Sequence, residues 1–291
     1  MNADARSLRE RLFIAMQHLL PQHLLSRLTG MLASSGFQPL KDWLIRRFIA
    51  HFAVDMSEAA EPDPGAYPHF NAFFTRALRE GMRPVDAAPR AITSPADGAV
   101  SQLGAIEDGR MFQAKGHWFS AAELLADPAD ARLFANGSFA TIYLSPRDYH
   151  RVHMPLSARL RTLRYVPGKL FSVNQVTAES VPGLFARNER LVCLFDTEHG
   201  PLAMVLVGAM VVAGIETVWT GPVTPAGRHV FNVDYQLDAA ARTLQKGAEM
   251  GRFQLGSTVI LLLPRGAVNW DEALAAGSPL RMGQRIGSLS R

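Results

Sequence analysis

Short apolar segments, separated by glycine, proline and aspartate, run through the sequence from about residue 91 onward and constrain the fold more than any other feature. The clearest of them are Phe139–Leu144, Leu191–Phe195, Leu202–Val207, Met210–Ile215 and Thr258–Leu263. Segments this short between turn residues are typical of β-strands rather than of helices. The pattern therefore predicts a mainly β domain of compact barrel or sandwich type.

The first 56 residues have a different pattern, in which apolar residues recur at helical spacing. The three stripes consist of Leu8, Leu12, Met16 and Leu19; of Leu24, Leu25, Leu28, Met31 and Leu32; and of Leu44, Ile45, Phe48, Ile49 and Phe52. Pro21 separates the first two stripes, and Gly36 and Pro39 end the second. A proline-rich turn at Glu61–Pro68 precedes a short aromatic helix expected at about Phe70–Leu78. We therefore expect an α+β fold, with a helical N-terminal region before the β domain.

The helical stripes allow two interpretations. Amphipathic helices with leucine and aromatic faces and arginine flanks can lie in a membrane interface. The same stripes can instead pack onto the protein's own core. Both interpretations hold together if different helices have different roles.

Composition excludes several classes of protein. The net charge of +4 comes from scattered Lys and Arg residues, whereas nucleic-acid binding calls for a clustered basic stripe. The longest apolar run, Leu202–Ile215, is broken by glycines and is shorter than the roughly 20 residues that a spanning helix needs. Cys193 is the only cysteine, so no internal disulfide forms, and its apolar neighbours predict a buried structural thiol. The N-terminus lacks the uncharged stretch of a secretory signal, which predicts a cytoplasmic protein.

Three segments combine reactive side chains with turn residues. The first is Ser94–Gly98, where Asp97 precedes a glycine between two apolar stretches. Such an aspartate is most often an ordinary turn residue that hydrogen-bonds its own backbone. A catalytic carboxylate is the alternative.

The second segment, Tyr143–Pro155, contains His150 and His153 beside an aspartate and two arginines. Because histidine titrates near neutrality, such a pair can supply a general base and a proton donor. A purely structural role is equally open. A metal site would need a third ligand, and none is evident nearby, so we predict no metal.

The third segment is Met250–Ile260, in which Gly256 and Ser257 stand at the entrance to an apolar strand. A Gly-Ser pair is ordinarily a tight turn. Glycine also permits a strained backbone, in which the Ser257 hydroxyl could attack the carbonyl of Gly256. That attack needs a base for the hydroxyl proton and donors for the developing oxyanion. The Gly-x-Ser-x-Gly elbow of esterases is absent.

Taken together, these motifs resemble the bacterial form of the pyruvoyl-dependent phosphatidylserine decarboxylase family. Besides the N-terminal helices, the segments that carry the resemblance are Pro95–Gly98, Phe112–Gly116, Tyr143–Pro155, Tyr165–Asn174, Phe185–Arg190, Gly214–Trp219 and Leu255–Thr258. They cover most of the chain in one order, and the stretch Thr220–Thr243 matches least well.

The resemblance implies a proenzyme that cuts itself between Gly256 and Ser257. In the family an Asp, a His and a Ser act as a protease-like triad, and the matching positions here are Asp97, His153 and Ser257. In such a triad the histidine takes the serine proton, and the aspartate fixes the imidazole tautomer. The products would be a β chain, 1–256, and an α chain, 257–291, which the apolar strand Thr258–Leu263 would keep together.

The resemblance further implies that Ser257 becomes a covalent pyruvoyl group, the pyruvate-derived cofactor and the site of Schiff-base formation with the substrate amine. The reaction would convert phosphatidylserine to phosphatidylethanolamine and CO2 in phospholipid biosynthesis, and His150 matches the proton donor for it. Arg147, Arg151 and Lys115 are candidate partners for the substrate carboxylate.

A lipid substrate favours the membrane interpretation of the N-terminus. We expect residues 1–60 to be an amphipathic helical membrane-associating region and residues 61–291 to be the β-rich catalytic domain. The protein would lie peripherally on the cytoplasmic side of the cell inner membrane and bind phosphatidylserine in an anionic bilayer. Its other partner would be itself, as a heterodimer of its two chains, with a higher homo-oligomer open and no nucleic acid.

Two other functions make different predictions. A lipid-directed serine hydrolase that uses the same Asp/His/Ser triad would keep an intact chain and react with serine-directed phosphonates. A non-catalytic β-rich scaffold that docks on membranes would be unaffected by Ser257→Ala.

Overall fold

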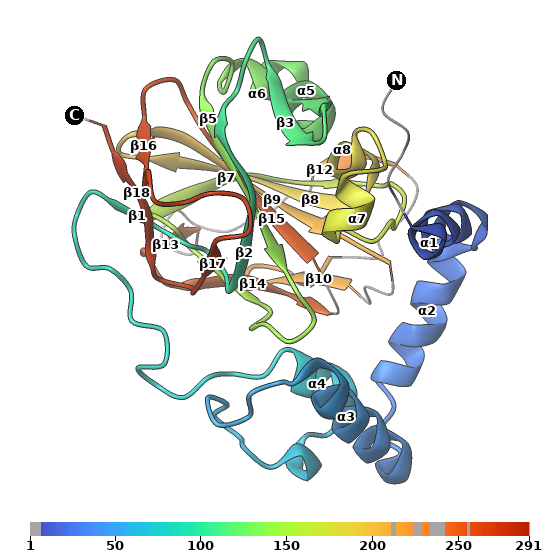
Figure 1. Cartoon of the computed structure of the whole chain (residues 1–291). Helices are drawn as coiled ribbons and strands as arrows, with labels where there is room; N and C mark the ends of the chain where they lie inside the picture. The colour runs from blue at the N-terminus through green and yellow to red at the C-terminus, as the bar shows by residue number, and fades with distance from the viewer. Residues whose placement is uncertain (1–6, 211–213, 224–228, 233–241, 255–256, 291) are drawn as a thin grey trace.

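The computed structural model describes residues 7–210, 214–223, 229–232, 242–254 and 257–290 (Figure 1). The helices are α1 (Leu8–Leu19), α2 (Gln22–Ala33), α3 (Gln38–Phe52), the 3-10 helix η1 (Pro64–Ala66), α4 (Phe70–Phe74), α5 (Ala121–Leu125), α6 (Pro128–Arg132), α7 (Gln175–Ala178) and α8 (Leu184–Arg187). The strands are β1 (Ala91–Thr93), β2 (Gly98–Ala105), β3 (Arg110–Ala114), β4 (His117–Ser120), β5 (Ser138–Leu144), β6 (Arg151–His153), β7 (Ala158–Val166), β8 (Arg190–Thr197), β9 (Gly200–Gly208), β10 (Gly214–Thr217), β11 (Gly221–Pro222), β12 (Phe231–Asn232), β13 (Thr243–Leu244), β14 (Glu249–Gln254), β15 (Ser257–Leu263), β16 (Val268–Trp270), β17 (Pro279–Leu280) and β18 (Arg285–Leu289).

A large antiparallel sheet organises the β domain, with strand order β12-β7-β8-β9-β15-β5-β2-β17 and β13 beside β7. Strand β15 lies at its centre and pairs with β5 from Ser257↔Leu144 to Leu263↔Ser138 and with β9 on its other side. Among the described strands the sheet is open, because its two ends do not pair with each other. Of the two architectures left open by the sequence, the sandwich is the one that fits.

Both faces of this sheet are buried. Along β8, Leu191, Cys193 and Phe195 point into one core cluster, while Val192 and Leu194 point into another. The first cluster also takes in residues of the two smaller sheets, β1-β18-β16 and β11-β10-β14-β6, and the second takes in the helices α5–α8 and the β3–β4 hairpin. Burial on two faces explains why these strands read as unbroken apolar runs rather than as alternating ones.

The N-terminal helices form an arm along one side of the β domain, in which α1 lies beside α7, α2 leads down away from it, and α3 and α4 lie below the β domain (Figure 1). Helix α1 begins at a capping box between Ser7 and Glu10. Helix α3 buries Ile45 in a separate aromatic cluster with α4, in which Phe48 contacts Phe70 and Phe74. The third stripe therefore packs onto protein, as one of the two interpretations predicts.

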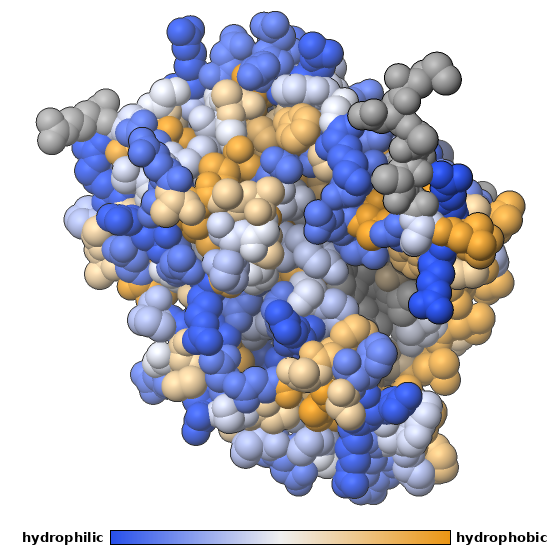
Figure 2. Space-filling model, in the orientation of Figure 1, coloured by the Kyte–Doolittle hydropathy of each residue, from blue (hydrophilic) through white to orange (hydrophobic). Residues whose placement is uncertain are grey.

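Helices α1 and α2 dock with their polar side chains and leave their leucines outside. The Gln17 side chain donates to Thr177 Oγ1 (3.2 Å) and accepts from the Ser172 N–H (2.7 Å). Gln22 accepts from the Leu170 N–H at 2.7 Å. The exposed apolar residues of this arm, called the apolar ridge below, are Leu8, Leu12, Met16, Leu19, Leu24, Leu28, Met31, Leu32, Phe37 and Trp43. Figure 2 shows hydrophobic surface gathered over α1 and α2.

Most predicted elements are confirmed, with differences at their ends. Four of the five predicted strands are present within two residues of their expected bounds, and Cys193 is buried as expected. The fifth, Met210–Ile215, is displaced: β10 covers Gly214–Thr217, and residues 211–213 lie outside the described part of the chain. Pro39 does not close the second helix but stands in the first turn of α3, where its missing N–H costs nothing.

The aromatic helix is shorter than predicted. It ends at Phe74, and the residues that follow pair with the segment before η1 instead: the Ala60 N–H donates to the Ala77 carbonyl, and the Arg79 N–H donates to the Glu58 carbonyl. Leu78 then forms an isolated β-bridge with Ala59. None of the described helices combines the length and apolar character needed to cross a membrane.

Candidate active site

Asp97 stands at the turn between β1 and β2. The next residue, Gly98, has φ +149°, and a Cβ there would lie 2.1 Å from the Tyr143 carbonyl oxygen, so only glycine lets the turn approach β5 this closely. The Asp97 carboxylate does not bond its own turn, which is the ordinary interpretation of an Asp-Gly pair. It accepts instead from the Met282 N–H (2.8 Å), on a segment 185 residues away.

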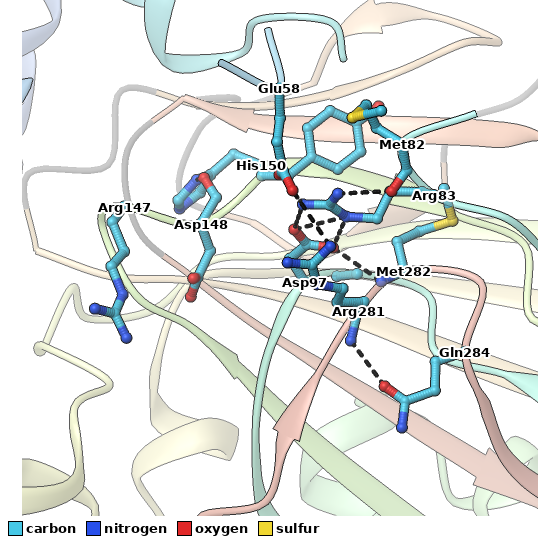
Figure 3. A network of polar contacts seen from close by, with 12 residues as sticks. Glu58, Met82, Arg83, Asp97, Arg147, Asp148, His150, Arg281, Met282 and Gln284 are labelled. Atoms are coloured by element: carbon cyan, nitrogen blue, oxygen red, sulfur yellow. Dashed lines mark hydrogen bonds and ion pairs between the residues drawn. The ribbon is translucent and has the colours of Figure 1, made fainter. Parts of the chain in front are cut away.

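Arg83 holds the same carboxylate with a fork of hydrogen bonds (Figure 3). Its Nε donates to both Asp97 oxygens at 2.8 and 3.0 Å, and its Nη2 donates to Oδ2 at 2.5 Å. Nη2 also donates to Glu58 at 2.6 Å, so Arg83 bridges two carboxylates. Burial acts to lower the pKa of Arg83, but the hydrogen bonds to both carboxylates raise it overall. The same contact lowers the pKa of Glu58, and the guanidinium stays charged at any physiological pH.

His153, on β6, is fixed as a neutral tautomer by two contacts. Its Nδ1 lies 2.8 Å from the Gly247 carbonyl oxygen, and its Nε2 lies 3.1 Å from the Tyr149 hydroxyl. Because a carbonyl only accepts, Nδ1 carries the proton, and Nε2 is the unprotonated nitrogen that accepts from the Tyr149 hydroxyl. Burial lowers the pKa of His153, which keeps Nε2 unprotonated near neutrality. This is the tautomer that a general base requires.

His150 is completely buried beside Phe74, whose ring centroid lies 4.0 Å away. Its Nδ1 donates to the Asp148 carbonyl at 2.8 Å, and its Nε2 has no hydrogen-bond partner among the described residues. Burial lowers the pKa of His150 to about 3. In the uncut chain, Nε2 is therefore an unprotonated acceptor, and a proton that it donates must first be taken from a reacting group.

Ser257 is the first residue of β15. Its backbone pairs with Leu144 on one side and Gly208 on the other, and its side chain is completely buried. The hydroxyl has no hydrogen-bond partner among the described residues. A buried polar group left unpaired costs about 1–3 kcal/mol, which is uncommon in a purely structural position. Gly256, the predicted site of the cut, lies outside the described residues.

The structure brings the three predicted segments together at one end of the large sheet. The His153 N–H donates to the Pro95 carbonyl at 2.8 Å, so β6 adjoins the Asp97 turn. Ser257 faces Leu144, which belongs to the segment Tyr143–Pro155 that carries both histidines. Among the described residues, however, the side chains of Asp97, His153 and Ser257 do not bond one another: Arg83 takes the first, and Gly247 and Tyr149 take the second.

The three candidate partners for the substrate carboxylate differ in where they lie. Lys115 is exposed in the β3–β4 turn and pairs with Glu179. Arg151 pairs with Glu249 at 2.9 Å. Arg147 lines a cavity beside Asp97, which makes it the one of the three placed at the site.

That cavity has a volume of about 540 Å³ and lies between the N-terminal arm and the β domain. Its acidic lining residues are Asp55, Glu58, Asp97 and Asp148, and its basic ones are Arg76, Arg83, Arg147 and Arg281. A cavity with both signs of charge is complementary to a zwitterionic group. Arg83, Glu58 and Arg76 carry no local sequence signal, because their partners are distant in the chain, 14 and 25 positions away for Arg83.

Comparison with known proteins agrees with this picture. A sequence profile of phosphatidylserine decarboxylase matches residues 70–288, and a second profile, described as PSD, matches residues 12–53. A phosphatidylserine decarboxylase proenzyme of Pseudomonas fluorescens is 62% identical over 284 residues, covering 96% of this chain and 98% of that protein. Two further proenzymes of the same name are similar to this chain along nearly their whole length. The one from Stutzerimonas stutzeri is 60% identical and covers 96% of this chain and 95% of that protein, and the one from Azotobacter vinelandii is 61% identical and covers 97% of this chain and 100% of that protein. The chain belongs to the phosphatidylserine decarboxylase family.

Proposed function

We propose that this protein converts phosphatidylserine to phosphatidylethanolamine and CO2 after cutting its own chain between Gly256 and Ser257. The observation that carries the proposal is the buried hydroxyl of Ser257, which no described residue pairs and which lies on a central strand beside the segment that holds both histidines. Membership of a family whose relatives are named as proenzymes supports the same conclusion.

Self-cleavage needs a base, a nucleophile and a support for the base. His153 Nε2 takes the Ser257 proton, and Oγ forms a bond to the Gly256 carbonyl carbon. The imidazolium then gives that proton to the Ser257 nitrogen as its bond to the carbonyl carbon breaks. Elimination across the Cα–Cβ bond of residue 257 then frees the Gly256 carboxylate. Addition of water to the resulting dehydroalanine releases ammonia and leaves a pyruvoyl group at residue 257. Asp97 stabilises the imidazolium that forms on His153.

This mechanism requires the contacts of His153 to rearrange. The Tyr149 hydroxyl lies 3.1 Å from Nε2 and must release it before Nε2 can take the Ser257 proton. In the uncut chain the Gly247 carbonyl, rather than Asp97, accepts from His153 Nδ1. A carbonyl fixes the tautomer as well as a carboxylate does but supplies no full negative charge to the imidazolium. Asp97 therefore acts through the field of its carboxylate, or comes into contact as the Gly256 bond is attacked.

The residues around Ser257 fit the pyruvoyl group that the family implies. In the conversion of Ser257, Oγ leaves with Gly256 and the Cβ of residue 257 becomes a methyl group, which suits a buried position where the hydroxyl has no hydrogen-bond partner among the described residues. The group supplies an electron-accepting carbonyl for the electrons released as CO2 leaves. His150 Nε2, which is buried and has no hydrogen-bond partner in the part of the chain that the structure describes, would hold the proton that returns to the substrate α-carbon.

We propose that residues 1–60 bind the membrane surface and residues 61–291 form the catalytic domain. The exposed leucines of α1 and α2, held outward while glutamines dock inward, support an interfacial role for these helices. A peripheral position on the cytoplasmic side of the inner membrane would bring the cavity to the lipid head group.

The serine hydrolase alternative lacks an open nucleophile. Ser257 Oγ is sealed from solvent in the uncut chain, which is the form a hydrolase would use for each substrate, whereas the decarboxylase meets its substrate only after the cut. The relatives are named as decarboxylase proenzymes, which gives the hydrolase no support.

The direct test supplies mixed micelles of phosphatidylserine labelled at the serine carboxyl carbon. The wild type should release labelled CO2 and no fatty acid, and Ser257→Ala should release neither. Fatty acid from the wild type, abolished by Ser257→Ala, would instead establish the hydrolase. Equal CO2 release by both proteins would contradict the role of Ser257.

A further inference from the structure

Arg76 is a buried cation with unused hydrogen-bond donors. Only 5% of the residue is exposed. Its Nη2 donates to the Arg147 carbonyl at 3.2 Å, and its guanidinium lies 5.5 Å from the centre of the Phe73 ring. Nε and Nη1 have no hydrogen-bond partner among the described residues. Buried charges in proteins are normally paired, so this arrangement calls for an explanation.

The other arginines of the cavity are accounted for by their surroundings. Arg83 is shared between Asp97 and Glu58, Arg281 pairs with Glu58 at 3.3 Å, and Arg147 is exposed at the mouth. Arg76 lines the same cavity, and burial lowers the pKa of its guanidinium. It is therefore the buried cation of this cavity with donors left for an incoming anion.

Arg76 also lies next to the residues assigned to the reaction. Two positions before it in the chain, Phe74 packs against His150. The Arg147 carbonyl that Arg76 bonds belongs to the loop leading to Asp148 and His150. A group anchored on Arg76 is therefore held beside His150.

We propose that Arg76 binds the phosphodiester group of phosphatidylserine. A guanidinium matches the paired oxygens of a phosphate with parallel N–H donors. The substrate carboxylate is the less suitable ligand, because it leaves as neutral CO2 and a cation bound to it would stabilise the ground state against reaction. The phosphodiester keeps its charge throughout, so binding it positions the head group without raising the barrier. This inference rests on the proposed decarboxylation.

The test compares Arg76→Gln and Arg76→Lys with the wild type, using short-chain phosphatidylserine. Arg159→Gln is the matched control, since it removes the same charge from an exposed surface pair with Asp196. Arg76→Gln should raise KM about tenfold to a hundredfold, as expected for lost hydrogen bonds to a charged group, with a much smaller change in kcat. Arg76→Lys should recover part of the loss, and Arg159→Gln should match the wild type.

Inhibition by the product separates the two anionic groups of the substrate. Phosphatidylethanolamine keeps the phosphodiester and lacks the carboxylate, so its inhibition constant should rise in Arg76→Gln by the same factor as KM. An inhibition constant unchanged by the substitution, with KM raised, would show that Arg76 binds the carboxylate and would overturn the proposal.

Stability and self-cleavage distinguish binding from a structural role. Removal of a buried, largely unpaired charge should leave the melting temperature unchanged or higher, and the chain should still cut itself. A lower melting temperature with unchanged KM would overturn the proposal and leave Arg76 structural. A wild type that releases no CO2 would overturn the proposed function and this inference together, whereas a wild type that turns over, with KM unaffected in Arg76→Gln, would overturn the inference alone.

Discussion

Asp97 is held in place by hydrogen bonds from two other segments of the chain. Its oxygens accept from Arg83 and from the Met282 N–H, while Glu58 binds the far side of the same guanidinium. The pair Arg83–Asp97 is nearly enclosed, with 7% and 9% of the two side chains exposed. A network this enclosed fixes the orientation of Asp97 and links it to the segment that follows α3 (Figure 3).

Arg83→Gln should slow self-cleavage and destabilise the fold. Removing one partner of a buried ion pair leaves two carboxylates without their cation, at a cost of about 3–5 kcal/mol. Arg83→Lys keeps the positive charge but not the set of parallel hydrogen bonds, so its cleavage rate and stability should lie between those of the wild type and Arg83→Gln. The measurements are the rate of appearance of the cut chains on a denaturing gel and the melting temperature.

Arg281→Gln is the control. It removes an exposed partner of Glu58 and should lower the free energy of unfolding by less than about 1 kcal/mol. Equal stability losses in Arg83→Gln and Arg281→Gln would contradict this account.

His150 makes the stability of the protein depend on pH. Its pKa falls from 6.5 in the unfolded chain to about 3 in the fold, so the unfolded state binds more protons between these values. The contribution of neutral His150 to the free energy of unfolding is therefore fully present above pH 6.5. As the pH decreases below that value, the free energy of unfolding falls by up to about 1.4 kcal/mol per pH unit. In the uncut Ser257→Ala background, His150→Gln should reduce the slope of unfolding free energy against pH by one proton. Urea titrations at several pH values between 5 and 7 measure that slope, and parallel lines for both proteins would refute the assignment.

The sequence identified the reactive residues better than their contacts. Asp97, the two histidines and Ser257 stand in local motifs that combine turn and reactive residues, and the fold brings their segments to one place. Arg83, Glu58 and Gly247 act through contacts between distant segments, for which one sequence contains no periodicity or motif. The tautomer of His153 could not be predicted for the same reason, because the Gly247 carbonyl that sets it lies on a distant segment.

At the scale of elements, the two halves of the helical arm differ in what they bury. Helix α3 buries its apolar stripe, with Ile45 completely enclosed, whereas Leu19 on α1 is 85% exposed and Gln17 is buried. A helix that docks by glutamines and exposes leucines is organised for a second apolar phase. Periodicity predicted all three helices, but it could not tell which stripe packs on protein, because both kinds have the same spacing.

Polar substitutions on the apolar ridge should weaken membrane binding without unfolding the protein. The variant Leu12→Gln/Leu19→Gln/Leu24→Gln removes three exposed leucines, and its affinity for vesicles containing phosphatidylserine should fall by at least about tenfold. Co-sedimentation measures binding, and the melting temperature should stay within a degree or two, as is usual for surface substitutions. Leu133→Gln, at an exposed leucine outside the arm, is the control. Equal binding by all three proteins would show that the ridge does not meet the bilayer.

The strands were predicted well because burial on both faces of the large sheet produces continuous apolar runs. The segment 257–263 is an example, with Val259 and Leu261 in one cluster and Ile260 and Leu262 in the other. The order of strands could not be predicted in this way, since β15 pairs with β5 and β9, which are far from it in sequence. Helix α4 is shorter than its aromatic pattern predicts, because residues 77–79 pair with residues 58–60, a contact that the local pattern does not contain.

For the whole molecule, the position of β15 decides what happens after the cut. The proposed small chain begins with the central strand of the large sheet and contributes β17 beside β2 and β18 beside β1. Its strands are thus interleaved with those of the large chain. Dissociation of the small chain would expose a row of backbone hydrogen-bond donors and side chains that are now buried.

The two chains should therefore remain together without a covalent link. Size-exclusion chromatography of the matured protein should give one peak that contains both chains, and only denaturant should separate them. Elution of chain 257–291 alone under native conditions would contradict the role given to β15.

The central claim is that this chain matures by breaking its own backbone at Ser257. The most direct test is the intact mass of the purified protein, wild type beside Ser257→Ala. The account predicts two wild-type chains, one ending at Gly256 and one beginning at a blocked residue 257, and a single uncut chain for the variant. A single full-length wild-type chain that still decarboxylates phosphatidylserine would contradict it.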